Sequence, residues 1–214
     1  MPRDGRHSRL LATAVLAAGA TAVVGIATTR PCVQRMDREI ERVTGRHRRR
    51  LRPAASVGTL PGEPWAHWMI GVCVATTILS RRRRSAAVVL VPLAGASLGA
   101  ILAHHAVKAV YRRPRPRIAL RRGKTEPAFP SGHTADATAV LATSAYLLVR
   151  EEVLPARVAA PAAAALALGT GVSRVILGWH WASDVVGGWL TGAAVASACA
   201  YGYERLRDPR SHAG

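Results

Sequence analysis

Six apolar runs free of Asp, Glu, Lys and Arg divide this chain, and they constrain its fold more than any other feature. A membrane-spanning helix needs about 17–25 mostly apolar residues, which the first, third and last runs provide, whereas the fourth reaches that length only if its helix begins near Ser131. Six such runs leave too little polar chain to cover a soluble core, so the sequence predicts an all-α integral membrane bundle of about six transmembrane helices. The runs are Leu10–Thr29, Pro64–Ser80, Ser85–Val107, Ala137–Val149, Val158–Ser173 and Val185–Tyr203.

The first apolar run follows Arg3, Arg6 and Arg9, which is also how a signal peptide begins. It is longer than the usual apolar region of a signal peptide, about 7–15 residues, which favours an uncleaved helix. The apolar residues are largely Ala, Val and Leu, and only 5% of all residues are aromatic, which favours closely packed helices over β-sheets. The 3 cysteines are an odd number, so neither a disulfide framework nor a zinc knuckle is expected.

Positive charge gathers in the segments between the apolar runs. The chain has 30 Lys and Arg residues against 12 Asp and Glu, a formal net charge of +18. The clusters Arg48–Arg52 and Arg81–Arg84 resemble nucleic-acid-binding patches in composition, but beside membrane spans such clusters more often bind anionic lipid headgroups. We therefore expect the bilayer and its anionic lipids as partners, and no nucleic acid. Within the basic loop 30–63, Arg46–Arg52 is a candidate interfacial segment.

Alternate loops of a helical membrane bundle face the same side, so the first, third and fifth loops share one face. These loops are 30–63, 108–130 and 174–184. All 5 tryptophans lie in or next to them, which is where indole rings meet lipid headgroups. If the N-terminus is cytoplasmic, the distribution of Lys and Arg opposes a simple positive-inside count, so charge alone does not set the orientation.

Polar motifs stand at the start and end of the third loop and again in the fifth. The third loop opens with Lys-x6-Arg-Pro, from Lys108 to Arg115, and closes with Pro-Ser-Gly-His, which includes Ser131 and Gly132; the fifth begins with Ser-Arg at Arg174. Taken singly, the two cations could be interfacial and the serine a helix cap. Together, fixed Lys and Arg donors, an open backbone amide and a helix N-terminus favour binding of an anion such as phosphate.

Two histidines and a carboxylate in these motifs supply the chemistry. His180 and Asp184 are four residues apart, so the carboxylate can accept the Nδ1 proton of the imidazole and leave Nε2 as a nucleophile. His133 lies on a separate segment, where it can protonate the leaving oxygen and then activate water. Without a metal ion or a cofactor, charge on the phosphoryl oxygens would be stabilised by Lys108, Arg115, Ser131, the Gly132 amide and Arg174.

Three further polar residues near the motifs are left outside the predicted site. Asp136 follows His133 by three residues, but an acid in the first turn of a helix is explained by the helix dipole. His104 and His105 lie about one turn before Lys108 and are interpreted as interfacial polar side chains.

The three motifs, Lys-x6-Arg-Pro, Pro-Ser-Gly-His and Ser-Arg-x5-His-x3-Asp, resemble in order and spacing the signature of the type 2 phosphatidic acid phosphatase superfamily. The resemblance implies a helical bundle, a phosphohistidine intermediate on His180, metal independence and a lipid substrate at a membrane face that is usually extracytoplasmic. Vanadium haloperoxidases share the motifs as soluble proteins, whereas this chain has the apolar runs of the membrane phosphatases. The motifs occupy 108–184 of a single expected domain, 1–214, and leave the basic loop 30–63 and the tail 204–214 unexplained.

The expected function is therefore hydrolysis of a lipid phosphate or a polyprenyl diphosphate by a multi-pass cell-membrane phosphatase. Residue types in the motifs fit an alternative headgroup equally well, a polyprenyl-phosphate sugar phosphate. A membrane protein that binds lipid phosphates without turnover is the alternative outside the enzymes. The presence of His133, His180 and Asp184 favours catalysis over binding alone.

Overall fold

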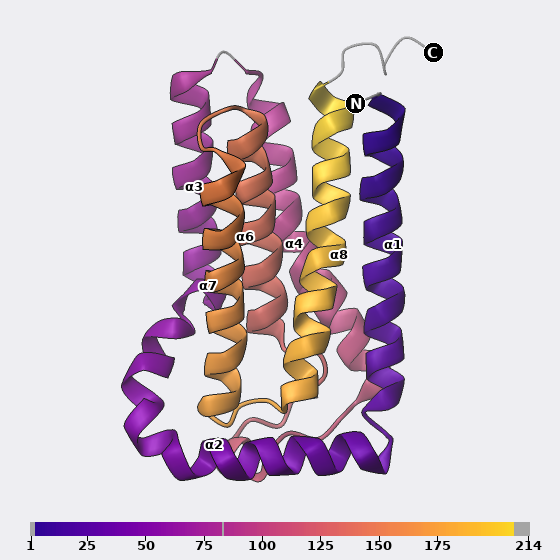
Figure 1. Cartoon of the computed structure of the whole chain (residues 1–214), viewed down its shortest axis with the longest axis vertical. Helices are drawn as coiled ribbons and strands as arrows, with labels where there is room; N and C mark the ends of the chain where they lie inside the picture. Colours follow the sequence, from indigo (N-terminus) through magenta and orange to yellow (C-terminus); the bar gives the residue numbers. More distant parts are fainter. Residues whose placement is uncertain (1–2, 83, 208–214) are drawn as a thin grey trace.

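A computed structural model describes residues 3–82 and 84–207 of the chain. Among the described residues, six long helices stand side by side, and a seventh, α2, lies across one end of the bundle (Figure 1). Two short helices complete the connections at that end. The elements are α1 (Arg3–Ala27), α2 (Pro31–Gly58), the 3-10 helix η1 (Leu60–Gly62), α3 (Pro64–Arg81), α4 (Ala86–Tyr111), α5 (Arg117–Arg121), α6 (Gly132–Arg150), α7 (Ala156–Ile176) and α8 (Ala182–Arg207).

Each predicted membrane span is one helix of the bundle, which confirms the all-helical membrane fold. Four described helices, α1, α4, α7 and α8, are long and apolar enough to cross a membrane by themselves. The other two, α3 and α6, lie beside them in the bundle. The α6 helix begins at Gly132, so it includes the polar residues that the fourth span needs to reach sufficient length. Its buried Thr134, Asp136 and Thr143 are shielded by neighbouring helices rather than exposed to lipid.

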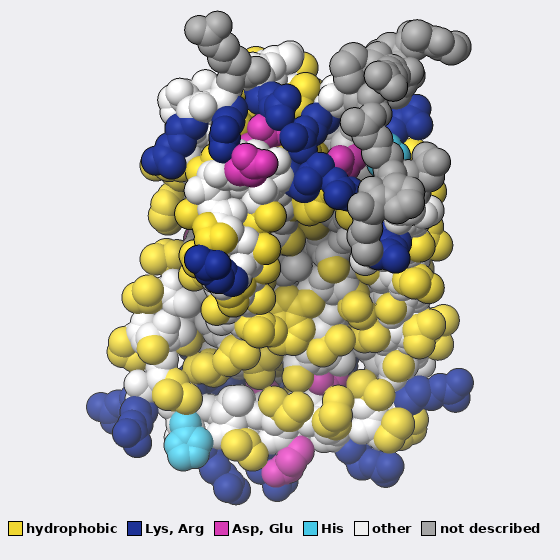
Figure 2. Space-filling model, turned by 45° about the horizontal axis from the view of Figure 1, so that its top comes forward, with side chains coloured by type: hydrophobic (Ala, Val, Ile, Leu, Met, Phe, Trp, Pro, Cys, Tyr) yellow, Lys and Arg dark blue, Asp and Glu magenta, His cyan; other side chains and the backbone are white. Residues whose placement is uncertain are grey.

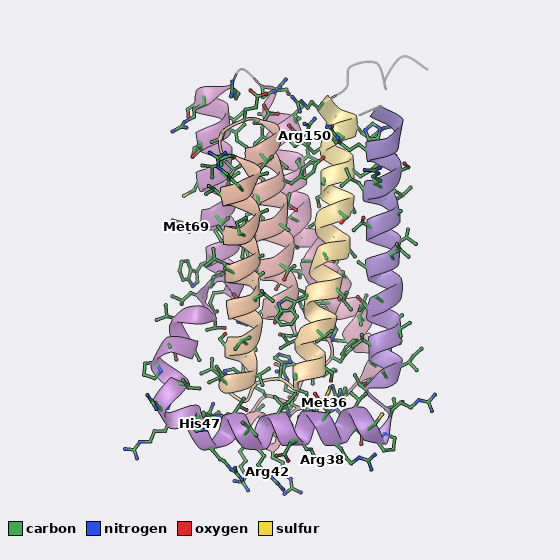
Figure 3. All side chains as sticks on the ribbon, in the orientation of Figure 1. Met36, Arg38, Arg42, His47, Met69 and Arg150 are labelled. Carbon is green, nitrogen blue, oxygen red and sulfur yellow. The ribbon has the colours of Figure 1, made fainter. Side chains whose placement is uncertain are left out.

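The segment 30–63, expected as a loop, is largely helical. Pro31 occupies the first turn of α2, where its missing N–H leaves no hydrogen bond unmade, and α2 continues to Gly58. Its inward residues, among them Val33, Asp37 and Thr44, recur at the spacing of one helix face. Arg38 and Arg42 point the other way and extend from α2 away from the bundle (Figure 3). The segment is thus an amphipathic helix that crosses the end of the bundle.

The helices pack around α6, which contacts α3, α4, α7 and α8. Two glycines allow α8 to approach α6 closely. A Cβ at Gly188 would lie 2.8 Å from the Ser131 carbonyl oxygen, and one at Gly192 would lie 2.5 Å from the Ala135 carbonyl oxygen. Small residues four positions apart are a common contact between membrane helices. This contact holds the start of α8 against the start of α6.

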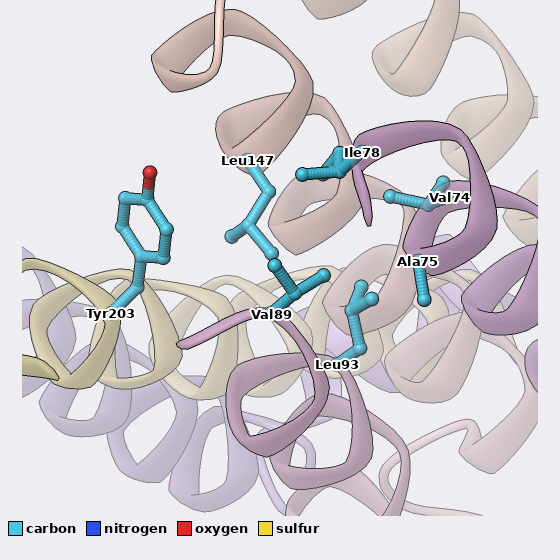
Figure 4. Packing of buried hydrophobic residues seen from close by; sticks show 7 residues of the cluster. All are labelled: Val74, Ala75, Ile78, Val89, Leu93, Leu147 and Tyr203. Carbon is cyan, nitrogen blue, oxygen red and sulfur yellow. The ribbon is translucent and has the colours of Figure 1, made fainter. Parts of the chain in front are cut away.

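Larger side chains fill the interior toward the other end of the bundle. Tyr203 and Leu147 are fully buried there, and apolar residues of α3 and α4 lie in the same cluster (Figure 4). The cluster joins α3, α4, α6 and α8 into one core. Its residues are Val74, Ala75, Ile78, Val89, Leu93, Leu147 and Tyr203.

Polar contacts close the end of the bundle opposite α2. In the basic run between α3 and α4, Arg84 Nε donates to Glu151 Oε2 over 2.8 Å, and Arg82 Nε donates to the Glu151 carbonyl over 2.8 Å. Part of the Arg81–Arg84 cluster therefore joins two connections of the protein itself. Between the two charged ends, a band of mostly hydrophobic side chains crosses the visible face of the molecule (Figure 2). That band is the surface a bilayer would cover.

Candidate active site

The three predicted motifs converge at the end of the bundle that α2 crosses, because α4 and α7 end there and α6 and α8 begin there. Lys108 is in the last turn of α4 and Arg174 in the last turn of α7. Ser131 precedes α6, and Asp184 is in the first turn of α8. The Ser131 N–H donates to the Asp184 carbonyl over 2.9 Å and links the two segments directly. The predicted common face of the first, third and fifth loops is confirmed.

Arg115 lies against the predicted nucleophile. Its Nη1 is 3.1 Å from His180 Nε2 and 3.0 Å from the Trp179 carbonyl, and its Nε donates to the Glu126 carbonyl over 2.8 Å. Both side chains are buried. The guanidinium is therefore held by two backbone carbonyls beside His180 Nε2.

The environment of His180 favours its neutral form. Burial, and then the positive charges of Arg115 and Arg174, lower the pKa of His180 well below its usual range. A neutral imidazole has a lone pair on one ring nitrogen, which a nucleophile requires. The surroundings of His180 thus suit attack on an anion.

Asp184 lies beside the other nitrogen of the same ring. His180 Nδ1 and Asp184 Oδ2 are 3.5 Å apart, which is longer than a normal hydrogen bond, and Nδ1 has no other hydrogen-bond partner among the described residues. The same carboxylate oxygen accepts the Trp181 N–H over 2.9 Å. Catalytic hydrogen bonds are often long in a structure without substrate, so this distance is compatible with an orienting role for Asp184.

His133 has a carboxylate partner that sequence reasoning missed. His133 Nε2 is 3.2 Å from Glu63 Oε1, and Glu63 is the residue that immediately precedes α3. Gly62 brings the connection close, since a Cβ there would lie 2.8 Å from the His133 Cβ. Asp136, left out of the predicted site, faces His104 instead, with 3.5 Å between Oδ1 and Nε2.

The remaining predicted phosphate ligands differ in what they contact. Arg174 Nη1 donates to Thr59 Oγ1 over 3.1 Å, while its Nε is buried without a hydrogen-bond partner. Lys108 contributes positive charge at both His180 and His133. Ser131 is fully buried and accepts a hydrogen bond from Thr134 Oγ1 over 2.9 Å. Gly132 lies against the His104 ring: a Cβ at Gly132 would be 3.1 Å from the ring.

Three more residues of this site escaped the sequence analysis. Arg113 Nη1 donates to Asp184 Oδ1 over 2.7 Å, and Arg113 Nη2 donates to Asp37 Oδ2 over 2.6 Å. Ser183 donates from both its N–H and its Oγ to the same Asp37. Arg113 is one of three arginines in four residues, so spacing did not separate it from Arg112. The one available signal was an acidic residue, Asp37, at an inward position of an amphipathic helix.

The site is rich in cations and nitrogen donors. Within the part of the chain that the structure describes, no group of three or more His, Cys, Asp or Glu side chains is arranged to hold a metal ion. Aromatic faces lie beside the cations: the guanidinium carbons of Arg122 and Arg174 are 5.1 and 5.8 Å from the Trp179 ring centre. An anion with several oxygens is the ligand that this set of donors fits.

Fold and site together define a multi-pass helical membrane protein whose histidines and cationic side chains gather at one end of its bundle. The model of the PAP2 superfamily matches residues 89–208, more than half of the chain, and this protein belongs to that superfamily. The resemblance drawn from the three motifs is thereby confirmed.

The fold is also similar to a solved structure described as the first transmembrane PAP2 type phosphatidylglycerolphosphate phosphatase from Bacillus subtilis. The TM-score is 0.80 and the sequence identity 24%, over 92% of this chain and 98% of that chain. This likeness concerns the fold, which is that of a PAP2 membrane lipid phosphatase. A comparison with curated protein sequences finds no significant match.

Proposed function

We propose that this protein is a metal-independent phosphatase of the cell membrane that hydrolyses a lipid phosphate or diphosphate through a phosphohistidine on His180. One observation supports this above the others: Arg115 Nη1 lies 3.1 Å from His180 Nε2. The predicted nucleophile and a side chain predicted to bind phosphate are therefore buried next to each other. The PAP2 membership and the similarity to a phosphatidylglycerolphosphate phosphatase support a phosphorylated lipid as substrate.

In the first step, the His180 Nε2 lone pair attacks the phosphorus atom, and the bond to the lipid oxygen breaks. His133 gives its proton to that leaving oxygen, which departs as an alcohol or, from a diphosphate, as a monophosphate. In the second step, His133 takes a proton from water, whose oxygen attacks the phosphorus and releases inorganic phosphate. His180 is thereby regenerated.

Stabilisation of the transition state comes from cations and amides fixed before substrate arrives. Three positive side chains, Lys108, Arg115 and Arg174, act on the same histidine. With the Gly132 amide at the start of α6 and the Ser131 hydroxyl, they would meet the equatorial phosphoryl oxygens. Fixed charges of this kind replace the metal ion used by other phosphoryl-transfer enzymes. Substrate would arrive from the bilayer, headgroup first, at the face we propose to be extracytoplasmic.

The test is release of inorganic phosphate by the detergent-purified protein in the presence of EDTA. Substrates would be phosphatidate, phosphatidylglycerol phosphate, polyprenyl diphosphate and a phosphorylated polyprenyl sugar. His180→Asn should abolish release, while His47→Asn, an exposed histidine on α2, should leave it unchanged. Full activity of the His180 variant would overturn the mechanism. Binding of these lipids by folded protein without any release would instead support a binding protein.

A further inference from the structure

We propose that Asp37 of α2 is a positioning residue for Asp184, so that the amphipathic helix across the end of the bundle completes the catalytic site. The inference rests on the proposed function, because it assigns Asp37 a role in orienting the His180–Asp184 pair. Asp37 lies outside all three motifs and outside the residues that the superfamily model matches.

Asp37 is buried, and both of its carboxylate oxygens accept hydrogen bonds from residues of the site. Its side chain is 1% exposed. Oδ2 accepts hydrogen bonds from Arg113 Nη2 and from Ser183 Oγ, each over 2.6 Å, and Oδ1 accepts the Ser183 N–H over 3.0 Å. Ser183 is the residue immediately before Asp184. The carboxylate of Asp37 therefore holds both the backbone next to Asp184 and the guanidinium that binds it.

A purely structural requirement does not explain a carboxylate at this position. Burying a charged pair costs desolvation that well-packed apolar residues avoid, so a buried ion pair is weak support for stability. The helix also has a separate attachment near its other end, where Arg48 Nε donates to the Ile176 carbonyl over 2.7 Å. The acidic group is better explained by what it does to Arg113 and Asp184.

Arg113 is shared between two carboxylates, and the sharing determines which oxygen of Asp184 it takes. Its Nη2 is bound to Asp37, so only Nη1 reaches Asp184, at Oδ1. Oδ2 remains on the side of His180 Nδ1, 3.5 Å away. Without the Asp37 carboxylate, the guanidinium can turn and bind both oxygens of Asp184, as arginine commonly binds a carboxylate. Arg113 would then compete with His180 for Oδ2.

The experiment compares Asp37→Asn with Glu39→Gln, an exposed acidic residue two positions further along the same helix. We expect Asp37→Asn to lower kcat about tenfold with little change in KM, as loss of a residue that orients a catalytic group does. Glu39→Gln should match the unmodified protein in both constants. Wild-type kcat in folded Asp37→Asn would overturn the proposal.

A double-mutant cycle separates positioning from general destabilisation. If Asp37 acts through Asp184, Asp37→Asn should add no further loss of kcat once Asp184 is already Asn. Independent losses that multiply in the double variant would overturn the proposal. Should Asp37→Asn fail to fold, Ser183→Ala removes one of its partners with a smaller change. Ser183→Ala should lower kcat by less than Asp37→Asn does, and it should add no further loss of kcat when Asp184 is already Asn. Losses that multiply in that double variant would also overturn the proposal.

The proposal and the proposed function fail in different ways. Activity that persists in His180→Asn removes the phosphohistidine mechanism whatever Asp37 does. Activity that depends on His180 but is unaffected by Asp37→Asn removes only the role of α2.

Discussion

Arg115 and His180 are 65 residues apart in the chain, yet Arg115 Nη1 lies 3.1 Å from His180 Nε2. Two backbone carbonyls, those of Trp179 and Glu126, hold the guanidinium in this position. A lysine has no planar fork and cannot make these contacts together with a phosphoryl oxygen. Arg115→Lys should therefore lower kcat about 10²-fold, as loss of one fixed oxyanion donor does. Arg117→Lys, at an exposed arginine nearby, is the control; equal kinetics in the two variants would remove Arg115 from the site.

The pH dependence of turnover should reflect the low pKa of His180. Burial, and then Arg115 and Arg174, lower that pKa, so His180 stays neutral as the pH falls through about 6.5, the usual value for histidine. Activity that requires neutral His180 should persist on the acid side of that value. Arg115→Gln removes a positive charge, so the pKa of His180 should rise and the acid limb of kcat/KM should move to higher pH. The pH profiles of the unmodified protein and of Arg115→Gln are measured with the same substrate, so that ionisation of the substrate affects both equally. An acid limb at the same pH in both proteins would contradict its assignment to His180.

Glu63 should matter through His133. Its carboxylate lies 3.2 Å from His133 Nε2 and can orient the ring. Glu63→Gln keeps the shape but removes the charge, and should lower kcat about tenfold without abolishing turnover. Glu39→Gln is the matched control on α2. An unchanged rate in Glu63→Gln would show that His133 needs no carboxylate partner.

Gly62→Ala should disrupt the site by contact rather than by charge. The added Cβ would lie 2.8 Å from both the Cβ and the carbonyl oxygen of His133, so either η1 or α6 must move. We expect a loss of about 1–3 kcal/mol in the free energy of unfolding, together with lower activity. Gly45→Ala introduces a Cβ that meets only the end of the Arg48 side chain at 3.9 Å and serves as the control. Thermal unfolding and phosphate release would be measured for both, and equal melting temperatures would argue against the close approach at Gly62.

The orientation of the site can be read from a native cysteine. Cys32 is exposed at the start of α2, on the same end of the bundle as the site, whereas Cys73 is exposed within the α3 span. If the site is extracytoplasmic, a membrane-impermeant maleimide should label Cys32 in intact cells, and Cys32→Ser should remove that labelling. Labelling that appears only after the cells are opened would place the site on the cytoplasmic face.

The opposite end of the bundle shows how far charge patterns can be interpreted without a structure. The composition of the Arg81–Arg84 cluster predicts binding to lipid headgroups, whereas in the structure Arg82 and Arg84 donate hydrogen bonds to Glu151. Tyr203 OH also donates to Glu151. This carboxylate therefore links α8 to the segment between α3 and α4. A run of arginines has the same appearance in the sequence whether its partners are lipids or distant carboxylates.

The sequence by itself determined the membrane helices, the parity of the loops and the residues of the three motifs. These follow from local properties: apolar length, the alternation of sides along a chain that crosses a membrane, and short spacings such as that between His180 and Asp184. Only the tertiary structure decided that α2 lies across the end of the bundle, and that Asp37, Glu63 and Thr59 reach residues in or beside the motifs. These contacts join residues 70 or more positions apart, and their geometry depends on how the helices pack. No periodicity in the chain encodes such a contact, because it exists only once the helices have assembled.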